Sequence, residues 1–135
     1  MSATQGDVLI VDDVGSSREL LATVLKQVCV MPFRMARDVS EALSACQEKL
    51  PEIVFLDIDL PDQSGLEVLK QVHARNPDVF IVMVSGVGTP DNVKQARERG
   101  AAAFILKPYK PQKVVEALAM YERKTLKPAL RPDAV

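Results

Sequence analysis

The fold is decided by Ile53-Val54-Phe55-Leu56-Asp57, an apolar run of strand length that ends in a carboxylate. Three other apolar runs end in polar residues in the same way: 8–11 before Asp12-Asp13, 79–84 before Ser85, and 103–106 before Lys107-Pro108. None of these runs alternates with a period of two, which is typical of strands covered on both faces of a parallel sheet. The carboxyl ends of such strands lie along one edge, so the sequence predicts that three carboxylates, a hydroxyl and an ammonium group meet there.

Segments of helical period separate these runs, and a weaker strand is predicted at residues 33–36. Asp38 and Thr89-Pro90 stand where helices should begin, and one helix should end before Asn76-Pro77. The apolar helix positions are Leu20, Leu21, Val24, Leu25 and Val28; Val39, Ala42, Leu43 and Cys46; Leu66, Leu69 and Val72; Val93 and Ala96; and Val114, Val115 and Leu118. Five β/α units predict an α/β fold, a doubly wound five-stranded parallel sheet with helices on both faces.

Composition excludes several classes of protein. The length of 135 residues fits one domain, and the net charge of −1 gives no reason to expect direct binding to nucleic acid or to a membrane surface. Residues 1–7 lack the basic and apolar regions of a signal peptide, and the run 79–84 is too short to span a bilayer. Cys29 and Cys46 lie at core-like helical positions, which favours reduced thiols. We therefore expect a cytoplasmic protein.

The residue types at the sheet edge suit phosphoryl chemistry. Crowded carboxylates disfavour one another's ionisation, and a bound Mg²⁺ ion, which prefers oxygen ligands, would relieve that repulsion. Asp57 could then act as a nucleophile toward a phosphoryl group, as carboxylates do elsewhere. The metal ion would neutralise one side of the developing charge and Lys107 the other, with the Ser85 hydroxyl bonded to a third oxygen.

A specific motif surrounds the candidate nucleophile: Asp57-Ile58-Asp59-Leu60-Pro61-Asp62-Gln63-Ser64-Gly65. With an acidic pair before it, and Ser85 and Lys107-Pro108 after it, this motif resembles the phosphorylation site of a known family. The family is the receiver domain of bacterial two-component response regulators, and the chain is similar to its chemotaxis regulators. The resemblance covers about residues 7–124 and implies the flavodoxin-like (βα)5 fold of that family.

The resemblance implies a role for each site residue. Asp57 would be the phosphoacceptor, and Asp12 and Asp13 would hold Mg²⁺ together with the backbone carbonyl of Asp59. Ser85 would be the hydroxyl that moves toward the phosphoryl group, and Phe104 the aromatic switch coupled to it. Lys107 would contact the phosphoryl group, and the Lys107-Pro108 peptide bond would be cis.

The resemblance also implies partners and a domain organisation. The phosphoryl donor would be a phosphohistidine on a histidine kinase or phosphotransfer protein. The chain would catalyse only its own phosphorylation and dephosphorylation, and would act on an unknown output protein through the face formed by residues 86–110. Phosphorylation-dependent dimerisation is left open. Residues 1–124 would form the receiver domain, and residues 125–135, TLKPALRPDAV, a flexible tail or a truncated linker.

Two other functions compete with this one. A phosphatase resembling the haloacid dehalogenase superfamily would use Asp57 as nucleophile, with Ser85-Gly86 and Lys107 as later motifs. Its remaining acidic residues should follow the lysine, however, whereas Asp12-Asp13 precede the nucleophile. A non-phosphorylated interaction domain is disfavoured by the complete set of site residues. Asp59 departs from the family pattern by adding a fourth carboxylate near the site, and Gln63 and Ser64 also differ from its commonest residues.

Overall fold

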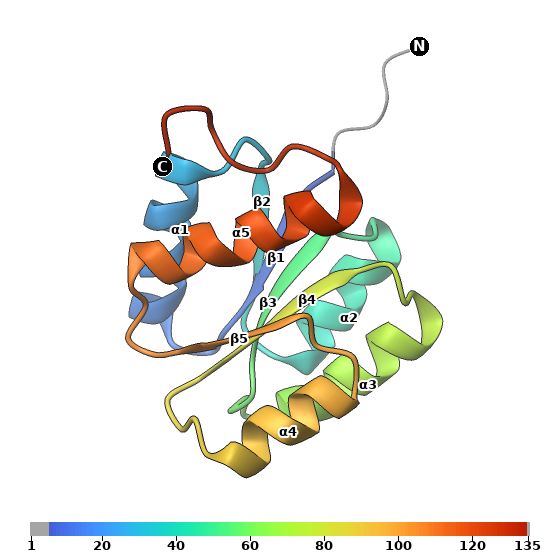
Figure 1. Ribbon diagram of the computed structural model, residues 1–135. Coiled ribbons are helices and arrows are strands. Elements are labelled where there is room, and N and C mark those ends of the chain that lie inside the picture. Colours follow the sequence, from blue (N-terminus) through green and yellow to red (C-terminus); the bar gives the residue numbers. More distant parts are fainter. Residues whose placement is uncertain (1–5, 135) are drawn as a thin grey trace.

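The structure of the protein is a computed structural model, and it describes residues 6–134 (Figure 1). Strands and helices alternate along these residues, five of each. The strands are β1 (Val8–Val11), β2 (Phe33–Ala36), β3 (Ile53–Asp57), β4 (Phe80–Ser85) and β5 (Ala103–Leu106), and the helices are α1 (Gly15–Val28), α2 (Val39–Glu48), α3 (Gly65–Arg75), α4 (Pro90–Glu98) and α5 (Pro111–Thr125). All strand pairs are parallel, in the order β2-β1-β3-β4-β5. The predicted doubly wound sheet is confirmed.

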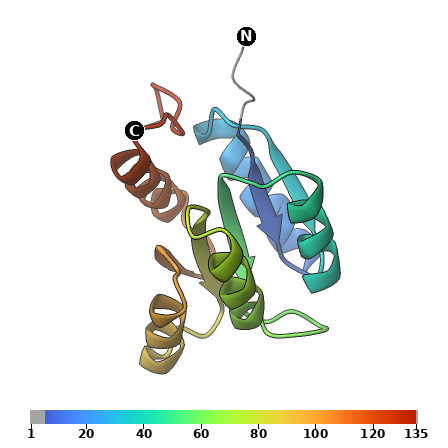
Figure 2. The same ribbon diagram turned by 90° about the vertical axis from the view of Figure 1, so that its right-hand side faces the viewer.

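Helices cover both faces of the sheet, as Figures 1 and 2 show. Successive residues of a strand point to opposite faces. Ile53 and Phe55 therefore pack with α1 and α5 in one buried cluster, whereas Val54 and Leu56 pack with α2, α3 and α4 in the other. This burial on both faces explains why the runs in the three central strands, β1, β3 and β4, show no alternation of polar and apolar residues.

Local sequence signals set the helix ends. The Asp38 side chain accepts a hydrogen bond of 2.8 Å from the Glu41 N–H, and the Thr89 hydroxyl accepts one of 3.1 Å from the Asn92 N–H. Such caps pair N–H groups that have no partner inside the helix. α3 ends at Arg75, before Asn76-Pro77, as predicted. Gly100 follows α4 with φ of 108°, a conformation that glycine adopts without strain.

Some apolar positions differ from the prediction. Leu20 was placed on the buried stripe of its helix but is 44% exposed, because α1 turns Leu21, Val24 and Leu25 toward the sheet instead. The expected strand at 79–84 is shifted by one residue, so that Ser85 is the last residue of β4. Of the two free thiols, Cys29 is buried just after α1, and Cys46, in α2, is only partly buried. Among the described residues, no helix is both long and apolar enough to cross a membrane.

The C-terminal segment packs against the domain, although the sequence predicts a flexible tail there. Leu126 adopts a left-handed conformation that turns the chain back from α5 toward α1 (Figure 1). Ala129 is fully buried, and its carbonyl accepts a 2.8 Å hydrogen bond from the Val30 N–H. The Glu122 carboxylate accepts hydrogen bonds from the N–H groups of Ala129 and Leu130 at 2.8 and 2.9 Å. These contacts hold Ala129 and Leu130 against the domain.

Replacing Glu122 with alanine is expected to destabilise the fold by about 1 to 2 kcal/mol, because two backbone N–H groups lose a charged acceptor. These N–H groups hold the pKa of Glu122 below its ordinary value. A lowered carboxyl pKa stabilises the fold above the pKa of the unfolded chain, and that contribution is lost as pH falls through the folded value. Urea unfolding at neutral pH and below about pH 4 measures both effects.

The matched control is Glu116→Ala, which removes an exposed carboxylate from the same helix. Its ion pair with Lys113, at 3.5 Å, lies on the surface and contributes little. A Glu122→Ala variant as stable as Glu116→Ala at neutral pH would show that the segment 126–134 does not depend on this carboxylate.

Candidate functional site

The strand ends bring the predicted residues to one edge of the sheet. Asp12 and Asp13 follow β1, Asp57 ends β3, and Ser85 ends β4. Lys107 follows β5, one of the two edge strands. The register aligns them, because Leu56 pairs with Val11 on one side and with Met83 on the other.

Lys107 lies between two buried carboxylates. Its Nζ is 2.9 Å from Asp57 Oδ2 and 2.8 Å from Asp12 Oδ2. The side chains of Asp12 and Asp57 are 1% and 4% exposed, whereas that of Lys107 is 20% exposed. A single ammonium group therefore offsets two carboxylates that are shielded from water.

This arrangement shifts the pKa values of all three groups. Burial raises the pKa of Asp57, and the opposing contributions of Lys107 and the Asp59 N–H do not cancel it. Burial acts in the same direction on Asp12, but Lys107, the Ser17 hydroxyl and the Val14 N–H outweigh it, so the pKa of Asp12 is lowered. Burial disfavours the charged form of Lys107, yet the two carboxylates prevail and raise its pKa.

The acidic residues fit a divalent cation. Asp12, Asp13 and Asp57 each offer a carboxylate oxygen, and these oxygens lie within 4.8 Å of one another. Among the described residues, the Lys107 ammonium group is the one partner of the buried Asp12 Oδ2. Asp59, the added carboxylate, is exposed and does not belong to this group. Oxygen ligands of this kind suit Mg²⁺.

The loop after β3 is held close to the acceptor. The Asp59 N–H donates a 3.0 Å hydrogen bond to Asp57 Oδ1. Gly65 opens α3 directly beneath this loop, and its N–H donates to the Ile58 carbonyl at 2.7 Å. A Cβ atom at Gly65 would lie 2.0 Å from the Asp57 carbonyl oxygen, so only glycine allows this close approach.

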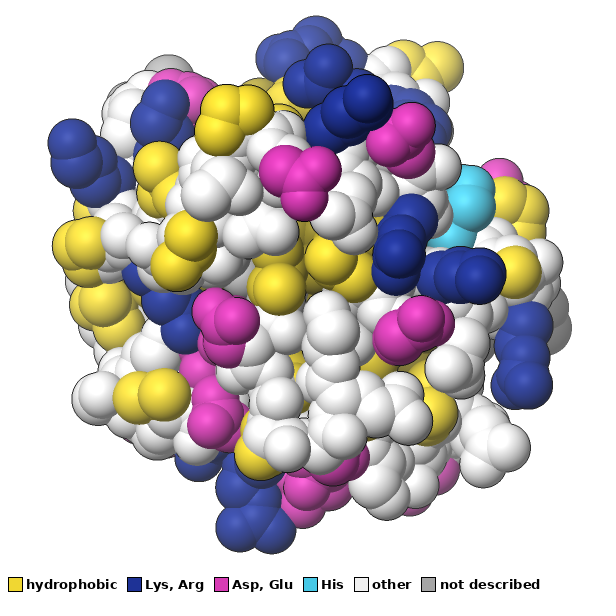
Figure 3. Space-filling view, turned by 90° about the horizontal axis from the view of Figure 1, so that it is seen from below, with side chains coloured by type: hydrophobic (Ala, Val, Ile, Leu, Met, Phe, Trp, Pro, Cys, Tyr) yellow, Lys and Arg dark blue, Asp and Glu magenta, His cyan; other side chains and the backbone are white. Residues whose placement is uncertain are grey.

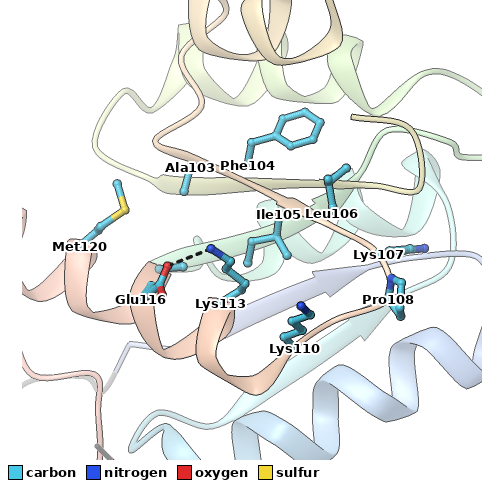
Figure 4. Close-up of a pocket in the computed structure, with 11 residues that line it drawn as sticks. Ala103, Phe104, Ile105, Leu106, Lys107, Pro108, Lys110, Lys113, Glu116 and Met120 are labelled. Carbon is cyan, nitrogen blue, oxygen red and sulfur yellow. Dashed lines mark ion pairs between the residues drawn. The ribbon is translucent and has the colours of Figure 1, made fainter. Parts of the chain in front are cut away.

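The two predicted switch residues bond to or pack against groups other than the acceptor carboxylate. Ser85 is fully buried, and its hydroxyl donates to the Val87 carbonyl and accepts from the Val87 N–H, at 3.1 and 3.0 Å. Figure 4 shows Phe104 on the opposite side of β5 from Ile105. The half-buried Phe104 ring packs on the α2–α4 side of the sheet, whereas Ile105 packs with α1 and α5. The Lys107-Pro108 peptide bond is cis, as the family resemblance implies.

Sequence reasoning missed three residues around Asp12. The Arg18 guanidinium donates a 2.7 Å hydrogen bond to the Asp12 carbonyl, and the Ser17 hydroxyl bonds the Asp12 carboxylate. Tyr109 is buried nearby, and its pKa is raised by burial and by the Asp12 charge. Side chains of a helix point toward its N-terminus. Polar residues in the first turn after Asp12-Asp13 could therefore have been predicted to contact Asp12.

Around the site, the face at the carboxyl ends of the strands carries charges of both signs. Figure 3, the view from below, shows Lys and Arg interspersed with Asp and Glu and with apolar side chains. A hollow of about 460 Å³ lies nearby between β5 and α5 (Figure 4). Leu106 and Met120 give it exposed apolar surface, whereas the neighbouring Tyr121 is buried.

Comparisons with known proteins agree on the family. The model of the response regulator receiver domain matches residues 8–119. The chemotaxis protein CheY of Listeria monocytogenes is 36% identical over 111 residues, covering 82% of this chain and 93% of that protein. The solved receiver domain of NtrX from Brucella abortus is 35% identical with a TM-score of 0.78, covering 86% of this chain and 98% of that one.

A CheY-like receiver domain protein from Methanospirillum hungatei has a TM-score of 0.81 at 25% identity, covering 92% of this chain and all of that one. These matches do not support the phosphatase alternative. They agree with the order of the site residues, in which Asp12-Asp13 precede Asp57. Proteins of the matched family are signalling regulators. The chain belongs to the response regulator receiver domain family of two-component signalling proteins.

Proposed function

We propose that this receiver domain accepts a phosphoryl group on Asp57 from the phosphohistidine of a histidine kinase or phosphotransfer protein. One observation carries the proposal: Asp57 ends a central strand in ion-pair contact with Lys107, within 4.8 Å of two further carboxylates. Its side chain is 4% exposed, so bulk water competes little with an incoming donor. The proposed acceptor is therefore held in a fixed position by its neighbours.

In the proposed reaction, a carboxylate oxygen of Asp57 attacks the phosphorus atom. The new O–P bond forms as the P–N bond to the donor imidazole breaks, and the imidazole nitrogen keeps the electron pair. Asp12, Asp13, Asp57 and the Asp59 carbonyl would hold Mg²⁺, which when bound neutralises charge on the phosphoryl oxygens. Lys107 would move from the carboxylates to a phosphoryl oxygen.

The proposed switch begins with Ser85. Its hydroxyl would leave Val87 for a phosphoryl oxygen, and Phe104 would follow into the space beside β4. These movements would shift the face formed by residues 86–110 between two conformations. An output protein, or a second copy of the domain, would distinguish the two. We place this activity in the cytoplasm and in the domain formed by residues 1–124.

Incubation with acetyl phosphate and Mg²⁺, followed by intact mass measurement, tests the proposal. The wild-type protein is expected to gain one phosphoryl adduct, and Asp57→Asn none. Asp59→Asn is the matched control, since it removes an exposed carboxylate two residues away and keeps the backbone carbonyl. Equal adduct in wild type and Asp57→Asn, or none in wild type, would contradict phosphorylation at Asp57.

Mg²⁺ is also expected to stabilise the fold, because it offsets carboxylates that crowd together in the native state. At about a hundredfold excess over its Kd, a ligand of the native state adds about 2 to 3 kcal/mol. Thermal unfolding with and without Mg²⁺ measures the effect. Asp13→Asn should abolish most of it, whereas Asp59→Asn should retain it, since Asp59 lies outside the carboxylate group. A melting temperature of wild type indifferent to Mg²⁺ would contradict the metal site.

A further inference from the structure

We propose that Asp62 is a positioning residue for Mg²⁺, acting through the loop that carries the Asp59 carbonyl. The inference rests on the proposed function, in which that carbonyl is one of the metal ligands. Asp62 itself is exposed, lies outside the carboxylate group and touches none of its members. Asp62 would affect the metal indirectly, by fixing the position of the loop that carries the Asp59 carbonyl.

Asp62 connects the loop after the acceptor to a different helix. Its Oδ1 accepts hydrogen bonds of 3.1 Å from the N–H groups of Val39 and Gln63, and its Oδ2 accepts one of 3.4 Å from the Ser40 N–H. Val39 and Ser40 are the first residues of α2, whose N–H groups have no partner within the helix. A carboxylate is also favoured at the positive end of the helix dipole.

The other end of the loop is fixed next to the site. The Asp59 N–H donates to Asp57, and Asp59 forms an antiparallel bridge with Ser64. These contacts tie the two stems of the loop to each other, and the Asp62 contacts tie its tip to α2. The Asp59 carbonyl lies between the two anchors. Releasing the tip would therefore let that carbonyl rotate while the Asp57 carboxylate keeps its place.

α2 itself has a second cap of its own. Asp38, the residue before the helix, accepts a 2.8 Å hydrogen bond from the Glu41 N–H. Asp38 and Asp62 thus perform the same chemistry at one helix end, but only Asp62 belongs to the loop. Comparing variants of Asp38 and Asp62 therefore distinguishes the two possible roles of Asp62, a helix cap and an anchor for the loop.

Calorimetric titration with Mg²⁺ compares wild type, Asp62→Ala and Asp38→Ala. Loss of a group that orients a metal ligand typically weakens metal binding about 10- to 100-fold, and we expect about 10-fold for Asp62→Ala because one ligand of several is loosened. Asp38→Ala should bind Mg²⁺ as wild type does, although both variants lose a cap. With acetyl phosphate, Asp62→Ala should need more Mg²⁺ for half-maximal phosphorylation yet reach the wild-type rate at saturation.

The outcomes separate the inference from the function on which it rests. Equal Mg²⁺ affinity in wild type and Asp62→Ala, or equal weakening in Asp62→Ala and Asp38→Ala, would reduce Asp62 to a helix cap and overturn the inference alone. A wild-type protein that takes up neither Mg²⁺ nor a phosphoryl group would overturn both. If Asp62→Ala is poorly folded, Asp62→Asn replaces it, because its amide nitrogen cannot accept the hydrogen bond from the Ser40 N–H and the negative charge is lost. A Mg²⁺ affinity of Asp62→Asn equal to that of wild type would then overturn the inference.

Discussion

Replacing Lys107 with methionine is expected to destabilise the metal-free protein by about 3 kcal/mol at neutral pH. The methionine side chain fills similar space but leaves Asp12 and Asp57 without their shared cation. Both carboxylates are almost completely buried, so water cannot replace the ammonium group. Urea unfolding in the presence of a chelator measures the loss.

The effect should depend on pH and on Mg²⁺. Without Lys107, burial and mutual repulsion raise the pKa of both carboxylates above their values in the unfolded chain. A raised carboxyl pKa penalises folding above that pKa, so the loss is largest at neutral pH and shrinks as the pH falls through it. Mg²⁺ should raise the melting temperature of Lys107→Met more than that of wild type.

Lys110→Met is the control for Lys107→Met, because Lys110 is an exposed lysine three residues along the same segment. Its replacement is expected to change stability by less than about 0.5 kcal/mol. A Lys107→Met protein that is as stable as Lys110→Met at neutral pH would show that the buried carboxylates are protonated or hydrated without the lysine.

Gly65→Ala is expected to destabilise the fold by about 3 kcal/mol and to weaken phosphorylation of Asp57. The added Cβ would lie 2.0 Å from the Asp57 carbonyl oxygen and 2.9 Å from Ile58 Cα. Both atoms belong to the backbone, so no side chain can rotate away to make room. Relief requires α3 to move away from β3, which displaces the acceptor strand.

Gly86→Ala gives the matched comparison, because a Cβ at Gly86 would meet no atom within 4 Å. Its stability should stay within about 1 kcal/mol of wild type, since alanine mainly restricts the unfolded chain. Urea unfolding and the yield of phosphoryl adduct, measured on both variants, test the two expectations together. Equal stability of the two alanine variants would contradict the close approach of α3 to β3.

The position of the site at the edge of the sheet could be predicted, because it follows from strong, local signals in the sequence. The buried run before Asp57 marks a strand by composition alone, and the parallel topology then determines where its carboxyl end lies. Cap residues such as Thr89 act within a few positions of themselves, so they too could be predicted. The proximity of the three carboxylates and the contacts of Lys107 follow from this placement.

Other features depend on contacts between distant segments and could not be predicted in this way. Glu122 bonds to residues seven and eight positions along the chain, and the Val30 N–H donates to the Ala129 carbonyl. Asp62 meets α2 more than twenty residues before it in the sequence. The Ser85 side chain differs, because a local contact sets its direction: it bonds to Val87, two residues along the chain, and the pattern of the strand does not reveal this.

The lysine shared by two aspartates has a consequence for ion selectivity. With all groups ionised, the three carboxylates near Lys107 leave two negative charges without a counterion. One divalent cation brings the site to electroneutrality, whereas Na⁺ or K⁺ leaves a residual charge in a poorly hydrated place. The valence of the ion, as well as its size, therefore distinguishes Mg²⁺ from the monovalent ions that outnumber it.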